Sequence, residues 1–172
     1  MDKIEQDFPN SQDILKIYNL DPNTGVFTYK IKTNRNVVIG SEAGTPDKDG
    51  YINLHINHKQ YRAHRVAFYC YHNHIPELPL IIEHIDGNPQ NNSINNLRIA
   101  SQLQNLANRK AHSHKRYKGV YKQGKKYYTQ IKLKGKTKHL GTFKTEIEAA
   151  KRYDEETKLI YGQYARLNFP NE

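Results

Sequence analysis

One pattern in the middle of the chain restricts its fold more than any other. Residues 80–84 are mostly apolar, and an asparagine-rich loop follows over residues 86–96. Residues 97–100 are typical of a second short strand, and Ser101 begins a capping-box sequence that predicts a helix over residues 102 to about 110. We therefore expect a strand, a long loop, a second strand and a helix in that order, as part of an α+β fold.

Four polar side chains recur at fixed places on this frame. Glu83 and His84 end the first strand, Asn96 ends the loop, and Asn105 falls in the early turns of the helix. Neighbouring residues of an extended strand point to opposite sides, so Glu83 and His84 should serve different purposes. Asn105 can face the end of the first strand.

The residue types fit metal-assisted hydrolysis of a phosphodiester. Carboxylate and amide oxygens are ligands of Mg²⁺, or of another divalent cation such as Mn²⁺, which makes Glu83 and Asn105 the candidate ligands. An imidazole titrates near neutrality, so His84 is the candidate general base. Asn96 can hold the loop through side-chain-to-backbone hydrogen bonds.

Each of these residues also has an ordinary explanation. An adjacent Glu and His are usually surface polarity, and an asparagine-rich loop is usually only a loop. The joint spacing on one frame favours the catalytic interpretation. His72 with His74, and His112 with His114, are spaced for metal binding but lack further ligands, so we interpret both pairs as surface or phosphate-facing residues.

Charge is distributed unevenly along the 172 residues, whose formal net charge is +10. No acidic residue occurs between Asp86 and Glu146, whereas thirteen Lys and Arg lie between Arg109 and Lys144. Residues 1–60, by contrast, carry eight acids and seven bases. The first inference is a polyanion partner, and the alternative is a solvated basic surface.

Apolar residues alternate with the bases in this segment, which predicts a second folded unit after a basic linker at residues 111–116. Strands are expected at residues 118–121, 127–133 and 136–143. Thr145 starts a second capping box, followed by a helix to about residue 161. A three-stranded sheet needs such a helix to bury its apolar face.

The remaining features limit the compartment and the first part of the chain. Cys70 is the single cysteine, which excludes a disulfide framework. No apolar run reaches about 18 residues and the polar N-terminus is no signal peptide, so we expect no membrane partner and a cytoplasmic location. Residues 11–20 predict a short helix, residues 26–30 a strand, and residues 51–63 a hairpin that leads into a further helix.

The central motifs resemble HNH homing endonucleases of the phage and intron-encoded kind. The resemblance covers roughly residues 18–110 and is carried by residues 21–29, 49–52, 63–68, 83–88, 95–98 and 101–109. It implies a ββα-metal fold with His84 as general base, Asn96 as the structural middle Asn and Asn105 as a metal ligand. Glu83 stands where many relatives have Asp.

The second unit resembles the plant APETALA/ethylene-response-factor DNA-binding domain. The resemblance is carried by residues 117–120, 140–143, 148–150, 153–154 and 167–170. That family lays a three-stranded sheet in the major groove. The matching positions are Lys118, Tyr121, Gln130, Lys132, Thr137 and His139. Arg65 and Arg109 complete the expected DNA contacts, with core packing as the alternative for Arg65.

These inferences combine into one prediction. The chain is expected to be a double-strand DNA endonuclease of a bacterial host cell, encoded by a phage or mobile element. Its HNH domain spans residues 1–110 and its targeting domain residues 117–172. One site per chain predicts a nick by a monomer, unless two chains pair as a weak homodimer. The alternatives are a non-catalytic, sequence-specific DNA-binding regulator with a degenerate HNH domain, favoured by Glu83, and an RNA-binding protein.

Overall fold

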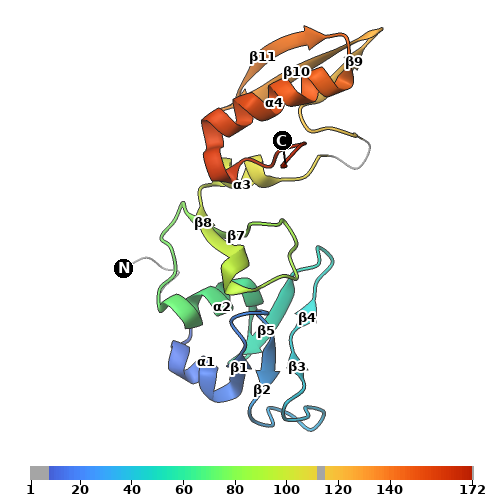
Figure 1. Cartoon of the computed structure of the whole chain (residues 1–172). Coiled ribbons are helices and arrows are strands. Elements are labelled where there is room, and N and C mark those ends of the chain that lie inside the picture. The colour runs from blue at the N-terminus through green and yellow to red at the C-terminus, as the bar shows by residue number, and fades with distance from the viewer. Residues whose placement is uncertain (1–7, 112–114, 172) are drawn as a thin grey trace. The chain divides into compact units, whose positions relative to one another are not determined.

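The structure is a computed structural model that describes residues 8–111 and 115–171. Two compact units divide the chain, Met1–Ser101 and Gln102–Glu172, and each is described by itself (Figure 1). Both mix small antiparallel sheets with helices, so the predicted α+β class is confirmed. Residues 112–114 of the predicted linker lie outside the described residues.

The first unit opens with a helix and a three-stranded antiparallel sheet. Helix α1 is Ser11–Ile17, and strands β1 (Tyr18–Leu20), β2 (Phe27–Tyr29) and β3 (Glu42–Ala43) pair in that order. The prediction of a helix over residues 11–20 is therefore wrong for its last three residues, which form β1.

Long-range contacts explain this early end. Tyr18 pairs with Tyr29 across the sheet, and its buried hydroxyl donates to the His55 carbonyl at 2.7 Å. Burial raises the pKa of Tyr18 to about 12. These partners lie outside the helical segment, so local helix propensity does not decide its end.

A second sheet joins β4 (Thr45–Pro46), β5 (Ile52–Ile56) and β6 (Lys59–Arg62). The predicted hairpin turn is present, and both of its residues, Asn57 and His58, have positive φ. Such a turn matches the twist of the flanking strands.

Helix α2 (Ala63–His72) follows β6 without a loop and forms the centre of the first core. Its face is buried because apolar residues recur at helical spacing. The buried core of this unit comprises Ile14, Tyr18, Phe27, Ala43, Leu54, Ile56, Ala63, Val66, Ala67, Phe68, Ile82, Ile94 and Leu97.

The predicted strand–loop–strand pattern is confirmed. β7 (Ile81–His84) pairs antiparallel with β8 (Leu97–Ala100), and the loop between them ends in the 3-10 helix η1 (Ile94–Asn96). The register places Glu83 opposite Arg98. Ile82 precedes Glu83, and Leu97 pairs with His84. Because Ile82 and Leu97 are buried in the core, they anchor the hairpin next to these two candidate residues.

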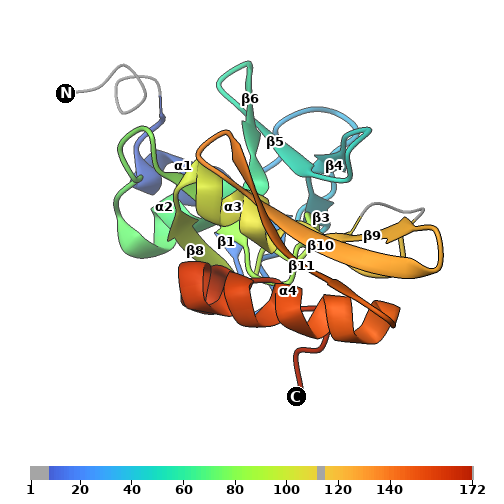
Figure 2. The same ribbon diagram turned by 90° about the horizontal axis from the view of Figure 1, so that it is seen from above.

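The second unit contains α3 (Gln102–Asn108) and a three-stranded antiparallel sheet packed on one long helix. The strands are β9 (Val120–Gln123), β10 (Lys126–Leu133) and β11 (Lys136–Phe143), with β10 in the middle. Helix α4 (Glu146–Tyr161) runs along one face of this sheet (Figure 2) and is followed by η2 (Gly162–Tyr164). The predicted capping box of Thr145 and Glu148 is present.

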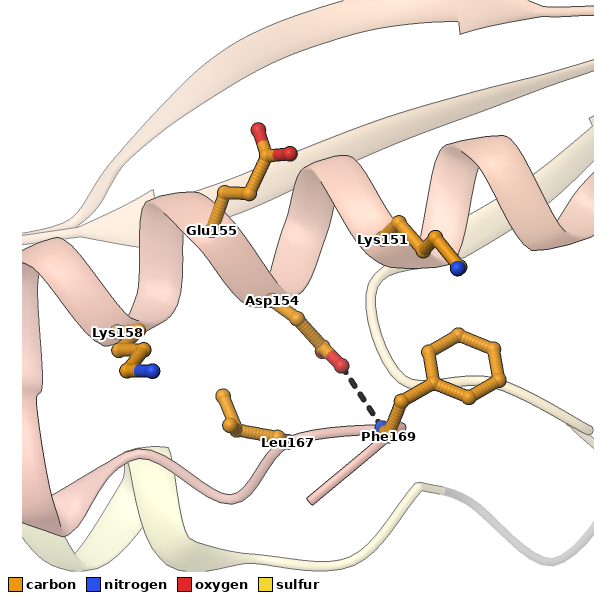
Figure 3. A pocket seen from close by; sticks show the side chains of 6 residues that line it. All are labelled: Lys151, Asp154, Glu155, Lys158, Leu167 and Phe169. Atoms are coloured by element: carbon orange, nitrogen blue, oxygen red, sulfur yellow. Dashed lines mark hydrogen bonds between the residues drawn. The ribbon is translucent and has the colours of Figure 1, made fainter. Parts of the chain in front are cut away.

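The C-terminal segment is fastened to α4 by a buried carboxylate. Asp154 accepts the backbone N–H groups of Asn168 and Phe169, each at 2.9 Å, and the latter bond is drawn in Figure 3. The Asn168 side chain in turn accepts from the Lys118 backbone N–H at 2.7 Å. Asp154 therefore joins the tail, α4 and the start of the sheet.

The first strand of this unit starts two residues later than predicted. Gly119 has φ +75°, and a Cβ there would lie 2.0 Å from the Tyr153 ring. Only glycine allows this approach, and Val120 is then the first residue to pair with β10. Within residues 8–111 and 115–171, no helix is long and apolar enough to cross a membrane.

Candidate functional site

Glu83 lies at the end of β7 with its carboxylate buried. The side chain is 3% exposed, and its Oε1 accepts a hydrogen bond from Arg98 Nε at 2.6 Å. Oε2 is also buried but has no hydrogen-bond partner within the described residues. A buried carboxylate oxygen without a partner is energetically costly, so this atom calls for a cation or a hydrogen-bond donor beyond those of residues 8–111 and 115–171.

His84 is buried on the same hairpin end, and its Nε2 lies 3.0 Å from Asn92 Oδ1. An amide oxygen only accepts, so Nε2 carries the proton and Nδ1 carries the lone pair of the neutral ring. Burial lowers the pKa of His84, while the Asn92 bond and the charges of Asp86 and Glu83 act in the opposite direction. The imidazole is thus neutral at neutral pH, as a general base must be.

Aromatic rings surround the His84 imidazole. The His64 ring lies edge-on with its centroid 4.8 Å from that of His84, and the Tyr51 centroid is 6.0 Å away. Arg62 stacks over Tyr51 at 4.3 Å and pairs with Asp47. Burial, helped by the positive charges nearby, lowers the pKa of His64 to about 3, so its ring is also neutral.

Asn96 connects the two ends of the loop, as its predicted role requires. Its side chain accepts the Asp86 N–H at 3.1 Å and donates to the Asn91 carbonyl at 2.8 Å. It also donates to Asp86 Oδ1 at 2.9 Å, and Asn91 donates to Asp86 Oδ2 at 2.7 Å. Hydrogen bonds hold the pKa of Asp86 below its usual range.

The loop is also supported from the N-terminal turn. Gly25 has φ +72°, and a Cβ at this position would lie 2.0 Å from the Asn92 carbonyl carbon. The Ile94 N–H donates to the Pro22 carbonyl at 3.0 Å. The turn that the sequence predicted at residues 21–25 therefore positions the residue that holds His84.

Asn105 lies half-buried in α3, within the second unit. Its place on the helix is the predicted one. Its pairing with Glu83 as a ligand remains a prediction from sequence spacing.

The donor set can be tested against the structure. No cluster of three or more His, Cys, Asp or Glu side chains able to hold a metal lies within residues 8–111 and 115–171. A cation here would therefore rely on few protein ligands, as Mg²⁺ does when it keeps several waters. The partnerless Oε2 of Glu83 fits such a hard cation.

The sheet of the second unit gathers most of the predicted DNA contacts on one face. Thr129 and Ile131 of β10 point to the buried face that packs on α4. The alternate residues of β10, and the residues of β9 and β11 that pair with them, point to the opposite face. The outward residues are Tyr121, Gln123, Lys126, Tyr128, Gln130, Lys132, Thr137, His139 and Thr142. This face carries lysines and no acid.

Aromatic rings line the same face. Tyr121 stacks on Tyr128 with centroids 5.1 Å apart and planes at 14°, and His139 follows at 5.9 Å from Tyr128. The Lys115 ammonium lies 3.4 Å from the Tyr121 ring centroid. A cationic and aromatic face suits a nucleic-acid surface.

Lys118 has different surroundings from those of the other predicted contacts. Its ammonium donates to the Ala107 carbonyl and lies 3.5 Å from the Leu106 carbonyl, at the C-terminal end of α3. Burial lowers the pKa of Lys118 to about 8. A lysine at a helix C-terminus stabilises the exposed carbonyls, which gives Lys118 a structural role inside the second unit.

The two predicted arginines also differ. Arg65 is half-buried on α2 with its guanidinium 5.7 Å from the Phe8 ring centroid, and burial lowers its pKa. These surroundings fit the packing alternative that the sequence left open, and a DNA contact by Arg65 stays a prediction. Arg109 is exposed just after α3, where it can meet a polyanion.

Sequence reasoning missed two partners of the candidate site. Arg98 was part of a motif but had no role, and Asn92 was one of several loop asparagines. The signal for Arg98 is its place in the second strand, opposite Glu83 once the register is known. Asn92 had no comparable signal, because its position depends on contacts with the distant 21–25 turn.

Part of this chain is similar to known HNH endonucleases. Residues 61–107 match the HNH endonuclease family. An uncharacterised HNH endonuclease of Acanthamoeba polyphaga mimivirus is 34% identical over 90 residues, which are 52% of this chain and 47% of that protein. A solved structure of the HNH homing endonuclease I-HmuI has 32% sequence identity and a TM-score of 0.39, covering 53% of this chain and 50% of that one.

Short matches involve plant proteins. Dehydration-responsive element-binding protein 2E of Arabidopsis thaliana is 58% identical over 33 residues, and the putative protein 2H is 64% identical over 31 residues. They cover 19% and 18% of this chain, and 14% and 20% of the relatives. The chain thus spans less than half the length of these curated relatives. The family match and the viral relative support an HNH endonuclease domain. The plant matches are short and only hint at a DNA-binding domain.

Proposed function

We propose that this protein is an HNH-type DNA endonuclease that hydrolyses phosphodiester bonds in double-stranded DNA. The observation that carries the proposal is the pair at the end of β7. A buried neutral imidazole, His84, adjoins a carboxylate, Glu83, that has one buried oxygen without a partner. A base and a carboxylate with an oxygen left for a cation, at consecutive positions of one strand, are the two elements that metal-assisted hydrolysis requires.

His84 has the properties of the base. With Nε2 donating to Asn92, Nδ1 takes the proton from the attacking water, and the Asn92 oxygen then stabilises the imidazolium that forms. Asn96 keeps the loop closed so that Asn92 remains in place. His64 and Tyr51 pack near the ring, with their centroids 4.8 and 6.0 Å from its own, and help to hold its orientation.

Glu83, together with Asn105 as the sequence spacing predicts, would hold Mg²⁺ or Mn²⁺. The cation supplies charge stabilisation at the phosphate oxygens and at the departing 3′ oxygen. Glu83 would contribute a carboxylate oxygen from a position that Arg98 fixes, and Asn105 would contribute an amide oxygen.

The second unit supplies the DNA affinity. Its outward sheet face carries Tyr121, Gln130, Lys132, Thr137 and His139, which we propose as the DNA contacts of a targeting domain. Lysines position a protein on phosphates, while Gln130 and His139 can meet base edges. Arg109 would add a phosphate contact. A single site per chain predicts a nick by the monomer.

Cleavage of supercoiled plasmid tests the proposal. The full chain with Mg²⁺ should convert supercoiled DNA carrying a target site to the nicked form. His84→Ala should slow this by about 10²- to 10⁴-fold, the range of general-base contributions. His55→Ala, a change of an exposed histidine in the same unit, is the control and should leave the rate unchanged. A wild-type chain that cuts no member of a library of candidate sites would overturn the proposal.

A second candidate is a DNA-binding regulator with an inactive HNH domain. The observation that favours it is the ion pair that occupies Oε1 of Glu83. This reading predicts tight, salt-sensitive binding to duplex DNA with no cleavage under Mg²⁺ or Mn²⁺. The plasmid assay, run beside a mobility-shift titration on the same DNA, separates the two functions. We also propose that the protein is encoded by a phage or mobile element, and the viral relative supports the mobile-element origin.

A further inference from the structure

We infer that Arg98 is a positioning residue that fixes the Glu83 carboxylate so that Oε2 alone is presented to a divalent cation. This inference rests on the proposed nuclease function and adds a residue to its machinery. In this role Arg98 contacts neither substrate nor cation and acts through Glu83.

The geometry of the pair is the first support. β7 and β8 place Glu83 and Arg98 directly opposite each other, and the Nε–Oε1 distance is 2.6 Å. The two side chains are 3% and 14% exposed. By comparison, Arg152 and Glu155 on α4 are 34% and 71% exposed at 3.6 Å, which is an ordinary surface pair. Burial on two paired strands leaves the Glu83 carboxylate little freedom to rotate.

The asymmetry of the pair is the second support. An arginine can bind both oxygens of a carboxylate through its planar fork, and this bidentate arrangement is the stronger one. Here Oε2 is buried and has no hydrogen-bond partner. A bidentate pair would give both oxygens a partner, whereas the arrangement here accepts the cost of a buried acceptor without one. The arrangement fits a carboxylate that binds Arg98 through Oε1 and leaves Oε2 for a cation.

Electrostatics makes the inference testable. A guanidinium next to a metal ligand repels the cation, so charge alone predicts that removing Arg98 strengthens metal binding. Orientation predicts the opposite, because a Glu83 carboxylate released from Arg98 can turn Oε2 away. The sign of the change in cation affinity therefore distinguishes the two roles.

The experiment titrates the full-length protein with Mn²⁺ alone and follows free Mn²⁺ by electron paramagnetic resonance. Arg98→Gln should weaken Mn²⁺ binding by about tenfold or more, as loss of a residue that orients a ligand does. Arg98→Lys keeps the charge but lacks the guanidinium Nε, so binding should be weakened less and the spectrum of bound Mn²⁺ should change. Arg35→Gln, with the same charge change at an exposed position, is the control and should bind as wild type.

Kinetics give a second measurement. The Mg²⁺ concentration for half-maximal cleavage should rise in Arg98→Gln, with the rate at saturating Mg²⁺ much less affected. Circular dichroism checks that the variant is folded. If Arg98→Gln does not fold, Arg98→Lys decides through its affinity and spectrum.

The Mn²⁺-binding and cleavage results together separate failure of this inference from failure of the proposed function. Mn²⁺ binding by Arg98→Gln that equals or exceeds that of wild type overturns the inference, as does an Arg98→Lys protein identical to wild type in affinity and spectrum. In both cases a wild-type chain that cleaves DNA keeps the proposed function intact. A wild-type chain that neither binds Mn²⁺ nor cleaves overturns both, because Arg98 would then have no cation for which to orient Glu83.

Discussion

His84 Nε2 and Asn92 Oδ1 lie 3.0 Å apart and are both buried. Because the amide oxygen accepts, the bond assigns the ring proton to Nε2 and the lone pair to Nδ1. A bond of this kind orients a catalytic imidazole in the way that a carboxylate does in hydrolase triads. Burial lowers the pKa of His84, and the Asn92 bond acts against that decrease and so supports the basicity of the ring.

This relationship predicts the pH profile of cleavage. The base must be neutral, so the rate should fall in acid as His84 takes up a proton. Burial lowers the pKa of His84 from its usual 6.5, which moves this fall to below pH 6.5. Asn92→Asp adds a negative charge next to the ring, raises the pKa of His84 and should move the acid limb to higher pH. Single-turnover rates from pH 5 to 9 at saturating Mg²⁺ measure the shift, and an unmoved limb would contradict the assignment of His84 as base.

A second prediction concerns acid stability and His64. Its pKa is lowered to about 3 in the folded chain, against 6.5 for the free side chain. The contribution of the neutral His64 ring to the free energy of unfolding is therefore fully retained above pH 6.5. It is lost as the pH falls toward 3, because in this range only the unfolded chain takes up the proton. At pH 4.5 the loss should be about 3 kcal/mol. Urea unfolding of wild type and His64→Gln at pH 7.5 and 4.5 should show a smaller pH effect in the variant, and His55→Gln should behave as wild type.

The helices and strands of this fold could be predicted from the sequence where residues close in the chain determine their bounds. The capping box at Thr145 and the alternation in β10 depend on neighbouring residues and were predicted correctly. The end of α1 was not, because Tyr18 is held extended by Tyr29 and His55, which lie far along the chain.

The candidate site divides in the same way. Glu83 and His84 could be named because they end an apolar strand. Their partners could not, because Arg98 depends on the register of the hairpin and Asn92 on the turn at Gly25. Side-chain period alone does not fix a register when the connecting loop is long.

The salt dependence of DNA binding separates Lys132 from Lys118. Lys132 is exposed on the outward sheet face, so Lys132→Gln should reduce the slope of log K against log salt by about 0.9, the loss of one phosphate contact. The Lys118 ammonium is engaged by α3 carbonyls, so Lys118→Gln should mainly lower the melting temperature and leave the slope nearly unchanged. Fluorescence titrations with a duplex at several salt concentrations measure both slopes. Equal reductions would show that Lys118 also contacts phosphate.

Gly25 offers a test of how the N-terminal turn supports the site. Gly25→Ala places a Cβ against the Asn92 backbone at a positive φ, so it should cost about 2 kcal/mol of stability or more and displace the loop. Cleavage should fall at least about tenfold at a temperature where the variant is folded, because Asn92 no longer orients His84. Gly40→Ala is the matched control, since Gly40 has φ +86° but nothing within 4 Å of the added Cβ. It should show the backbone strain alone and cleave at the wild-type rate. If the two variants lose activity equally, the contact between Gly25 and the Asn92 loop is not what holds the base.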